Sequence, residues 1–366
     1  VSSATAVDLI TPSHHGKDIH HRYCEHQVLG AYIFHQKEDL VQTILANKTV
    51  LATGGIGNLY LHNSNTYSSR GDGHAMAKRV GARIINMEFI QFHPTTLFIK
   101  KGHSRFLISE TLRGEGGKLL DQAGKPFMQN YHPDRELAPR DVVSQAIWEE
   151  MIAKKQDYVY LDMTHLSTQH LQTRFPTIFE KCMESQIDIS QKPIPVVPAA
   201  HYTCGGVHTD IWGKTNVAHL YAIGEVACNG LHGANRLAST SLLEGLVFGY
   251  RAAEKIAEEN SPHRFSASDI MEWQYGAKEL DLTLVGQDWL TLKQTMWNYV
   301  GIKRTTDRLN RAEAMFREMN QEIERFYKDS VLHDELIGLR NAVEIAQMVV
   351  SASKRNQKSL GCFYRE

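Results

Sequence analysis

The sequence predicts an α/β protein with an interrupted first domain, an inserted α+β domain and a C-terminal helical bundle. Apolar strands that end in glycine occur on both sides of a central region, that region has a mixed character, and the residues after 260 show helical periodicity alone. At 366 residues the chain is long enough for several cores. We therefore expect a first domain at residues 1–86 and 203–260, an inserted domain at 87–202 and a helical domain at 261–366.

The first segment contains two apolar strands, at residues 28–33 and 49–53, and the second runs directly into the glycine cluster at 54–57. An α/β sheet presents its backbone to ligands at the carboxyl ends of strands, although a simple turn would also use these glycines. Residues 71–77 predict a turn that opens a helix, with Asp72 near its start. The chain begins at Val1 in what already reads as a strand, without initiator methionine or signal peptide, so we expect a fragment whose N-terminal part is missing.

The central region is predicted to combine a hairpin with helices. Residues 118–125 read as a hairpin with Asp and Gly in its turn, helical stretches follow, and three prolines punctuate the far end at 193–198. The α/β pattern returns at residues 217–225, a strand that ends in Gly-Glu, and a long helix is expected from near Ser241 toward Glu259. Sheet material on both sides of the insertion implies a discontinuous first domain.

Residues 259–263 are predicted to form a linker, and the chain beyond it is helical. Apolar residues recur there at helical spacing in two stripes, one at Leu309, Ala312, Phe316, Met319, Ile323 and Phe326, the other at Leu336, Leu339, Val343, Ala346 and Val350. Packing within a small helical bundle explains these stripes better than recruitment of a partner does.

Composition argues against several classes of function. The formal net charge is -1, which gives no general attraction to nucleic acid or to an anionic membrane, and no apolar run is long enough to span a bilayer. Five cysteines without C-x-x-C spacing are typical of a reducing, cytoplasmic compartment. The histidine-dense residues 14–21 could hold a metal, but a solvated loop is the better interpretation because acidic or cysteine ligands at a suitable spacing are lacking. No metal site is therefore predicted.

Three short segments supply histidine, glutamate and arginine on constrained backbone. Residues 91–96 place His93 before a proline, which restricts it to extended conformations. Residues 109–117 mix charges with glycines, and a predicted helix start at 139–141 adds Arg140. Each segment alone has an ordinary reading, as a structural His-Pro, a charged surface loop or a surface ion pair. Together they suit a small dicarboxylate and the transfer of its proton.

Two further segments strengthen this interpretation. Residues 200–207 place His201 just before a glycine pair, and residues 230–244 form a polar, glycine-bearing loop that leads into a helix. A helix N-terminus offers unpaired N–H groups and a partial positive charge, which suit an anion or an electron-rich ring. Capping alone would explain the serines of this loop, but it does not explain the preceding His232, Asn235 and Arg236.

In this order and spacing, the segments resemble the flavoprotein family of L-aspartate oxidase and of the succinate dehydrogenase and fumarate reductase flavoprotein subunits. The resemblance covers nearly the whole chain, from Thr-Gly-Gly at 53–55 to the helical tail. His-Tyr-Thr-Cys-Gly-Gly-Val at 201–207 and residues 296–306 are more similar to the L-aspartate oxidase branch. The resemblance implies that the predicted domains are an FAD-binding domain, a capping domain and a helical domain.

The resemblance also implies roles around a bound dicarboxylate. Arg140 corresponds to the proton donor or acceptor, and the other implied catalytic residues are His93, His201 and Glu110. The implied substrate-binding residues are Gln91, His93, Ser109, His201 and Arg236. Arginine suits a two-pronged grip on a carboxylate, which lysine would not reproduce. Ser109 stands where threonine is common in the family, and the hydroxyl is kept.

Non-covalently bound FAD is the implied cofactor. The resemblance places Thr5 and Ala6 near the adenine end and brings Asp72, Glu225, Ser241 and Leu242 against the cofactor, with a ribose-type hydroxyl at Glu225. The backbone N–H groups of 241 and 242 would face the pyrimidine end of the flavin, where a helix dipole stabilises the reduced anion. The glycine-rich fingerprint that binds the pyrophosphate is expected upstream of Val1.

The implied reaction is the oxidation of L-aspartate to iminoaspartate, with oxygen reduced to hydrogen peroxide and fumarate as an alternative acceptor. In this family the reaction is the first step of NAD biosynthesis through quinolinate, so functional coupling to quinolinate synthase is expected. Two alternatives stay open. The chain could be a succinate dehydrogenase or fumarate reductase flavoprotein subunit, or a truncated chain without cofactor or activity.

Overall fold

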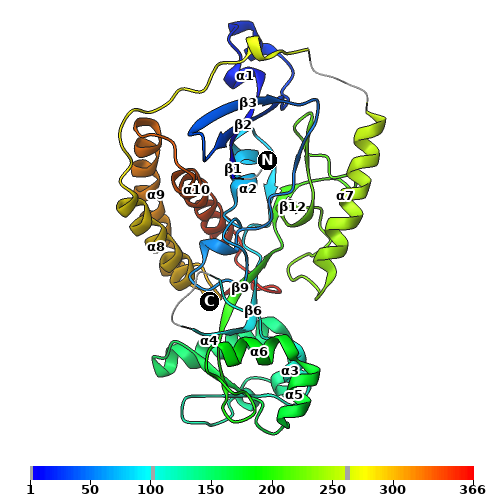
Figure 1. Cartoon of the computed structure of the whole chain (residues 1–366), viewed down its shortest axis with the longest axis vertical. Coiled ribbons are helices and arrows are strands. Elements are labelled where there is room, and N and C mark those ends of the chain that lie inside the picture. The colour runs from blue at the N-terminus through cyan, green and yellow to red at the C-terminus, as the bar shows by residue number, and fades with distance from the viewer. Residues whose placement is uncertain (1–2, 100–103, 260–263) are drawn as a thin grey trace.

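The computed structural model describes residues 3–99, 104–259 and 264–366. Figure 1 shows an elongated molecule with a small sheet at one end and a group of strands and short helices at the other. Three long helices line one flank, and a single long helix stands on the opposite flank. The predicted fold class is confirmed. Residues 1–2 of the predicted opening strand and residues 260–263 of the predicted linker lie outside the described residues.

The sheet at the upper end of Figure 1 is antiparallel and contains strands β1 (Ala4–Ile10), β2 (Gly30–His35) and β3 (Leu40–Leu45). Burial alternates along β1 and β2, as expected for a sheet with one face against a core. That face packs on Ile270, Leu332 and Ile337 from the C-terminal third of the chain. The histidine-dense segment contains a short helix α1 (Pro12–His15) and a 3-10 turn η1 (Ile19–Tyr23). Across the described residues, no group of side chains is arranged to hold a metal ion.

The discontinuous α/β part is assembled from segments far apart in the sequence. Strand β4 (Thr49–Leu51) lies parallel to β11 (Leu220–Ala222). Strand β10 (Gly206–His208) pairs with β5 (Ile84–Ile85) on one side and with β12 (Ala227–Cys228) on the other. Helix α2 (Asp72–Arg79) packs beside them and buries Met76 and Ala77. A 3-10 turn η2 (Gly57–Leu59) follows β4, and η5 (Gly224–Val226) follows β11.

The inserted part is built on a four-stranded antiparallel sheet in the order β6 (Ile90–Leu97), β9 (Ile194–Thr203), β8 (Val159–Asp162) and β7 (Lys118–Leu120). Its helices are α3 (Glu110–Gly114), α4 (Arg140–Lys154), α5 (Thr168–Arg174) and α6 (Pro176–Glu184), with short 3-10 turns η3 (Met128–Asn130) and η4 (Arg135–Leu137). Every residue of β6 is buried, because helix α4 covers it on the far side from β9. In Figure 1 β6 and β9 connect this part to the rest of the molecule, side by side.

The hairpin predicted at residues 118–125 is only partly correct. The turn exists, since the Asp121 carboxylate accepts hydrogen bonds from the backbone N–H groups of Ala123 and Lys125. However, β7 pairs with β8, and the residues after the turn form one bridge between Leu120 and Pro126. Proline has no N–H group to extend a ladder, so the second arm of the hairpin does not form.

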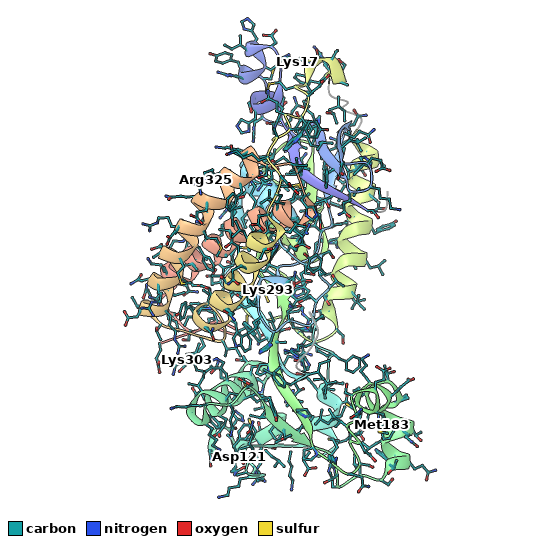
Figure 2. All side chains as sticks on the ribbon, turned by 60° about the vertical axis from the view of Figure 1, so that its left-hand side comes forward. Lys17, Asp121, Met183, Lys293, Lys303 and Arg325 are labelled. Atoms are coloured by element: carbon teal, nitrogen blue, oxygen red, sulfur yellow. The ribbon has the colours of Figure 1, made fainter. Side chains whose placement is uncertain are left out.

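The predicted helical bundle consists of α8 (Leu282–Tyr299), α9 (Thr306–Asp329) and α10 (Asp334–Arg355), preceded by a 3-10 turn η6 (Ala267–Asp269). The stripe on α10 is buried throughout, and on α9 only Met319 and Phe326 remain half-buried. Lys293 of α8, labelled in Figure 2, donates a hydrogen bond to Asn58 in η2 at 3.0 Å and ties the bundle to the α/β part. Among the described helices, none is both long enough and apolar enough to cross a membrane.

Helix α7 (Thr240–Glu258) stands apart from the body of the protein, on the right in Figure 1. Of its side chains, Glu244 and Ala252 are the buried ones. Leu242, Leu246 and Tyr250 are exposed by 83%, 70% and 64%, and they follow one another at helical spacing. This helix therefore presents an apolar stripe outward rather than into the core, unlike α9 and α10.

The C-terminus adds a feature that the sequence did not reveal, a parallel pair of short strands β13 (Lys303–Arg304) and β14 (Tyr364–Arg365). Arg304 is almost fully buried beside this pair. Its guanidinium donates to the carbonyl oxygens of Gly301 and Glu88 and to the Ser353 hydroxyl, at 2.7 to 3.0 Å. It thereby joins helix α10 to the segment before β6.

Replacing Arg304 with alanine is expected to lower the free energy of unfolding by about 3 kcal/mol, because three buried acceptors lose their donor. Urea titration measures this as a lower midpoint with an unchanged slope. Arg317→Ala is the control, since that side chain is 69% exposed and should change stability by less than about 0.5 kcal/mol. Equal midpoints for the two variants would contradict the structural role of Arg304.

Candidate functional site

The paired strands β6 and β9 bring His93 and His201 together. The pairing is irregular on both sides of His93, with register shifts between Gln91 and Phe92 and between His93 and Thr96. The two imidazole rings meet edge to face with centroids 5.4 Å apart. His93 is fixed from its own strand, with Nδ1 3.0 Å from the Thr95 carbonyl oxygen. The stiff His-Pro segment thus fixes one ring, and the neighbouring strand supplies the second.

Both histidines are neutral near neutral pH. Burial lowers the pKa of His93 well below its usual range, and the nearby His201 and Arg140 lower it further. Burial, and then the charges of Arg236 and Arg140, lower the pKa of His201 to about 4. His201 Nδ1 also lies 2.8 Å from the Ser64 hydroxyl oxygen. These rings therefore act as hydrogen-bonding groups, and the positive charge of the site resides on arginines.

Arg140 is the first residue of α4 and forms a two-pronged ion pair with Glu110. Its Nε lies 2.6 Å from Glu110 Oε1 and its Nη2 lies 3.1 Å from Oε2. Glu110 is the first residue of α3, where Ser109 caps the helix by accepting a hydrogen bond from the Thr111 N–H group. Arg113 donates to the same Glu110 oxygen at 3.0 Å. The third nitrogen of Arg140 is thus left to point elsewhere, toward Gln91.

Gln91 links the two arginines of the site. Its Oε1 accepts hydrogen bonds from Arg140 Nη1 at 3.3 Å and from Arg236 Nη2 at 3.0 Å. Its Nε2 donates to Asn235 Oδ1 and to the Arg236 carbonyl oxygen, which fixes the orientation of the amide. Because the Gln91 amide carries no net charge, it does not neutralise Arg140 and Arg236. Burial and the charge of Arg140 lower the pKa of Arg236, so an anion bound between them would relieve their repulsion.

Arg236 rests on an aromatic ring that is itself tied to a buried carboxylate. Its Cζ atom lies 4.4 Å from the centroid of the Tyr202 ring. The Tyr202 hydroxyl donates to Glu244 Oε2 at 2.5 Å, and His232 Nε2 lies 2.8 Å from the same oxygen. Asn229 donates to the other Glu244 oxygen at 3.3 Å. Arg236 therefore packs on the face of the Tyr202 ring, and the negative charge of Glu244 acts on it only from a distance. Its guanidinium remains free to bind an anion.

These side chains surround one cavity of about 650 Å³, which lies within the usual range for a small-molecule site. Most of the residues that the sequence predicted for the site line it, namely His93, Ser109, Glu110, Arg140, His201, Glu225, Arg236, Ser241 and Leu242. Gln91 lies directly behind the two arginines. Segments that are as much as 177 residues apart in the sequence (242 minus 65) therefore meet at this cavity.

Three predicted cofactor residues lie away from this cavity. Thr5 and Ala6 are in β1, where the Thr5 hydroxyl donates to Asp334. Asp72 begins α2, and its carboxylate accepts hydrogen bonds from Arg70 and Asn341. The predicted contacts of these three residues with the cofactor therefore stay predictions.

Several residues of the site were not singled out from the sequence. Asn65, Leu107, Thr111, Ala238 and Ser239 also line the cavity. They lie on loops or at helix starts where no pattern marks them. Tyr202 and Glu244 were visible inside recognised motifs, but their pairing depends on packing between β9 and α7. A signal for Glu244 existed, since it is a carboxylate on an apolar stretch of helix.

The residues present fit a flavin nucleotide. A Cβ atom on Gly55 would fall 2.1 Å from Glu225 Oε1, and one on Gly73 would fall 2.1 Å from Thr53 Oγ1. The glycine run after β4 therefore allows the start of α2 and the end of β11 to approach it closely. Thr53 is exposed, so this junction can be reached from outside. The site's other wall is the start of α7, where Ser239 makes no side-chain cap.

Glu225 stands at this junction and accepts a hydrogen bond from the Thr203 N–H group at 2.9 Å. Burial raises the pKa of its carboxyl from 4.5 to about 7. The folded protein therefore keeps a proton that the unfolded chain releases. We expect the free energy of unfolding to fall as pH rises from 4.5 to about 7 and to level off above that range.

Glu225→Gln should remove this contribution. Urea midpoints measured between about pH 5 and pH 8 are expected to decline less steeply for the variant than for the wild type. Parallel curves for the two proteins would show that another group carries the pH dependence.

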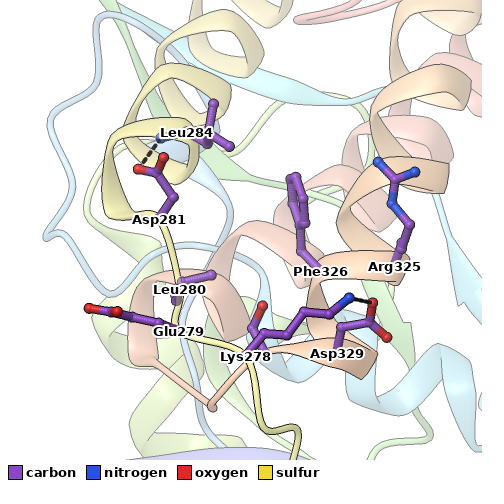
Figure 3. A pocket seen from close by; sticks show the side chains of 9 residues that line it. Lys278, Glu279, Leu280, Asp281, Leu284, Arg325, Phe326 and Asp329 are labelled. Carbon is purple, nitrogen blue, oxygen red and sulfur yellow. Dashed lines mark hydrogen bonds and ion pairs between the residues drawn. The ribbon is translucent and has the colours of Figure 1, made fainter.

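A second cavity, of about 390 Å³, lies where α8 begins and α9 ends (Figure 3). Three of its charged groups already have partners: Lys278 pairs with Asp329 at 2.5 Å, and Asp281 caps α8. Phe326 and Leu284 provide its apolar wall. No set of charges converges there as it does around Gln91, so this cavity is a weaker candidate.

Comparison with known proteins agrees with this geometry. Residues 2–242 match the family described as FAD binding domain, and residues 289–366 match the family described as fumarate reductase flavoprotein C-terminal domain. L-aspartate oxidase 1 of Ralstonia nicotianae is 48% identical over 92% of this chain, and L-aspartate oxidase of Yersinia pestis is 43% identical over 98%. A solved structure of E. coli quinol fumarate reductase superposes with a TM-score of 0.82 at 30% identity, over 99% of this chain and 65% of that one.

The chain spans 63% of the length of the Ralstonia protein and 66% of that of the Yersinia protein. The shared part includes every element that lines the cavity around Gln91, because the match to the first family extends to residue 242.

Proposed function

Because this chain belongs to the FAD-binding flavoprotein family that includes the L-aspartate oxidases and the fumarate reductases, we propose that it acts in the oxidation of L-aspartate to iminoaspartate. The observation that carries the proposal is the shared oxygen of Gln91, on which Arg140 and Arg236 converge from two different parts of the chain. Arg140 is paired with Glu110, so Arg236 is the guanidinium that is left to bind a carboxylate of the substrate, next to the Arg140–Glu110 pair.

The chain's own residues provide binding and proton transfer. Arg236 grips one carboxylate of the substrate, while His93 and His201, both neutral, donate or accept hydrogen bonds beside it. Fixing both ends of a short dicarboxylate aligns its α-carbon in one orientation, which supplies much of the rate enhancement. FAD, when held beside this carbon, would supply the acceptor for its hydride. The start of α7 and the junction at Glu225 would hold the cofactor.

Arg140 and Glu110 form the proposed proton-transfer pair. Two of the guanidinium nitrogens of Arg140 donate to Glu110, so Arg140 can pass a proton to this carboxylate, 2.6 Å from its Nε, and take one from the substrate in its place. The remaining nitrogen points to Gln91 and the cavity. Glu110 is also held by Arg113 at 3.0 Å, which keeps its carboxylate in place while the proton moves.

Fumarate reduction is the second candidate, favoured by the structural similarity to quinol fumarate reductase. The same pair would then deliver a proton to the substrate instead of removing one. We further propose, from the similarity to L-aspartate oxidases and from the scattered cysteines, a cytoplasmic enzyme of NAD biosynthesis whose product passes to quinolinate synthase.

The direct test supplies the purified protein with FAD and oxygen and follows peroxide formation with a peroxidase-coupled dye. L-aspartate should give peroxide, whereas succinate should give little. An artificial electron acceptor added with succinate checks the alternative. Turnover of succinate without turnover of L-aspartate would favour the dehydrogenase reading, and no turnover of either would refute the proposed function.

Glu244→Gln tests the support beneath Arg236. The variant keeps an acceptor for Tyr202 but loses the negative charge, so we expect KM for the dicarboxylate to rise by about tenfold while kcat stays nearly constant. Glu258→Gln, on the same helix and 69% exposed, should leave both constants unchanged. A fall in kcat with an unchanged KM would place Glu244 in another role.

A further inference from the structure

Two cysteines meet beneath the loop that bears Arg236. Cys204 follows strand β9, and Cys362 lies two residues before β14. Both are buried, with 4% and 9% of their surface exposed, and they belong to one small apolar cluster with Phe89, Tyr202 and Phe363. Both are free thiols. Although 158 residues separate them in the sequence (362 minus 204), they meet in this cluster, and each thiol shifts the pKa of the other.

The same pair holds the loop backbone. Cys362 donates to the Ala234 carbonyl oxygen through its N–H group at 3.0 Å and through its thiol at 2.9 Å. The Arg236 backbone lies beside the Cys204 thiol and lowers its pKa. The contact is close: a Cβ atom on Gly361 would fall 2.4 Å from the Ala234 carbonyl oxygen. The position of Arg236 in the cavity therefore depends in part on two thiols in their reduced state.

The surroundings of the two thiols differ. The neighbouring Cys362 thiol, the Arg236 backbone and the charge of Arg236 lower the pKa of Cys204. Burial and the neighbouring Cys204 raise the pKa of Cys362. A thiol with a lowered pKa beside a thiol with a raised pKa is the arrangement in which a first sulfur is oxidised and a second resolves it.

We propose that Cys204 and Cys362 form a peroxide-sensitive dithiol, whose oxidation to a disulfide cross-links the C-terminal segment to the end of β9 and displaces the loop that bears Arg236. The proposal rests on the proposed function only for the source of its oxidant, the hydrogen peroxide released next to the pair. No disulfide is otherwise expected in a reducing compartment, so the link would form during turnover and be reversed by cellular thiols.

The chemistry balances with one peroxide for each pair. The Cys204 thiolate attacks one peroxide oxygen, the O–O bond breaks, and Cys204 becomes a sulfenic acid while hydroxide leaves. The Cys362 sulfur then attacks the Cys204 sulfur, the S–S bond forms and the sulfenic oxygen leaves as a second hydroxide. The two thiol protons convert both hydroxides to water. Two thiols and one hydrogen peroxide thus give one disulfide and two waters.

Disulfide formation should weaken dicarboxylate binding. The Cys362 thiol can no longer donate to the Ala234 carbonyl oxygen, and the Cys204 sulfur turns from the Arg236 backbone toward its new partner. We expect the affinity for succinate, measured by calorimetry, to fall by about tenfold on oxidation, within the range typical of coupled sites, and to return after reduction.

Mass spectrometry tests the link directly. The protein is treated with a small excess of hydrogen peroxide, blocked with N-ethylmaleimide before unfolding and cut with trypsin. Cys362 lies on peptide 359–365, and Cys204 shares peptide 182–214 with Cys182, because Lys192 precedes proline and is not cut. We expect these peptides joined, with the combined mass lower by two hydrogens, and separated after dithiothreitol.

Matched variants make the result decisive. Cys182→Ala should retain the link, which assigns it to Cys204, and Cys362→Ala should abolish it. Peptide 359–365 recovered unlinked, or joined to the Cys228 peptide at 215–236, would overturn the proposal. Because peroxide is added, the outcome does not depend on L-aspartate turnover. A protein that forms the link but makes no peroxide refutes the proposed function alone.

Discussion

Replacing Arg140 with leucine is expected to lower kcat for L-aspartate oxidation by about 10²–10⁴-fold, the usual contribution of a positioned proton-transfer group. Leucine removes every nitrogen that faces Glu110 and Gln91, so no group remains between the cavity and the carboxylate that accepts the proton. Glu110 keeps its hydrogen bond from Arg113, and the helix that carries residue 140 keeps its proline start. The defect should therefore be chemical rather than structural.

Three measurements separate the chemical effect of Arg140→Leu from other effects. Steady-state kinetics gives kcat and KM, urea titration gives stability, and calorimetry with succinate gives affinity. Arg174→Leu is the matched control, because this arginine also pairs with a glutamate in the inserted part but is 56% exposed. Undiminished turnover by Arg140→Leu would assign proton transfer to another residue.

Replacing Arg236 with leucine is expected to weaken succinate binding by about 10²–10³-fold, as is usual when one partner of a buried charge pair is truncated. The side chain is nearly buried, and its neighbours Gln91, Ser241 and Tyr202 offer no replacement charge. The loss should appear in KM and in the calorimetric affinity, with a smaller effect on kcat.

Lysine at position 236 provides the sharper comparison. It restores the charge but not the planar fork that can grip a carboxylate with two hydrogen bonds and stack on Tyr202. We expect Arg236→Lys to recover only part of the affinity. Acetate, a monoanion, should bind weakly to all three proteins. Full recovery by lysine would show that charge alone is recognised.

The regular elements were predictable because their patterns are local. Strand β4 shows as an apolar run before glycine, and the stripes of α9 and α10 follow the helical period, so the fold class could be read from the sequence. The parallel pair β13 and β14 could not, since each strand is two residues long and its partner is 61 residues away (364 minus 303). The second arm of the hairpin at 118–125 was wrongly predicted because turn chemistry alone does not determine which strand pairs with β7.

The site residues that lie in recognisable sequence motifs could be predicted. His93, Arg140 and Arg236 lie in short, unusual segments, and family resemblance supplied their proposed roles. The support around them was not predictable, because it depends on which side chains meet in space. Tyr202 and Glu244 are 42 residues apart, and only the folded arrangement of α7 and β9 brings them within hydrogen-bonding distance. The thiol pair escaped notice for the same reason, since Cys204 and Cys362 have no local spacing to connect them.

Strands β6 and β9 leave and rejoin the rest of the molecule as hydrogen-bonded neighbours. A region whose two ends are adjacent can be inserted into a host, or cut out of it, at little cost in chain entropy, because no long loop has to be closed or opened. The region from β6 to β9 can therefore be replaced as a single unit. This region could be exchanged for the equivalent region of a relative. Arg236 and α7 would stay unchanged, and Arg140 and Glu110 would be transferred together as one proton-transfer pair.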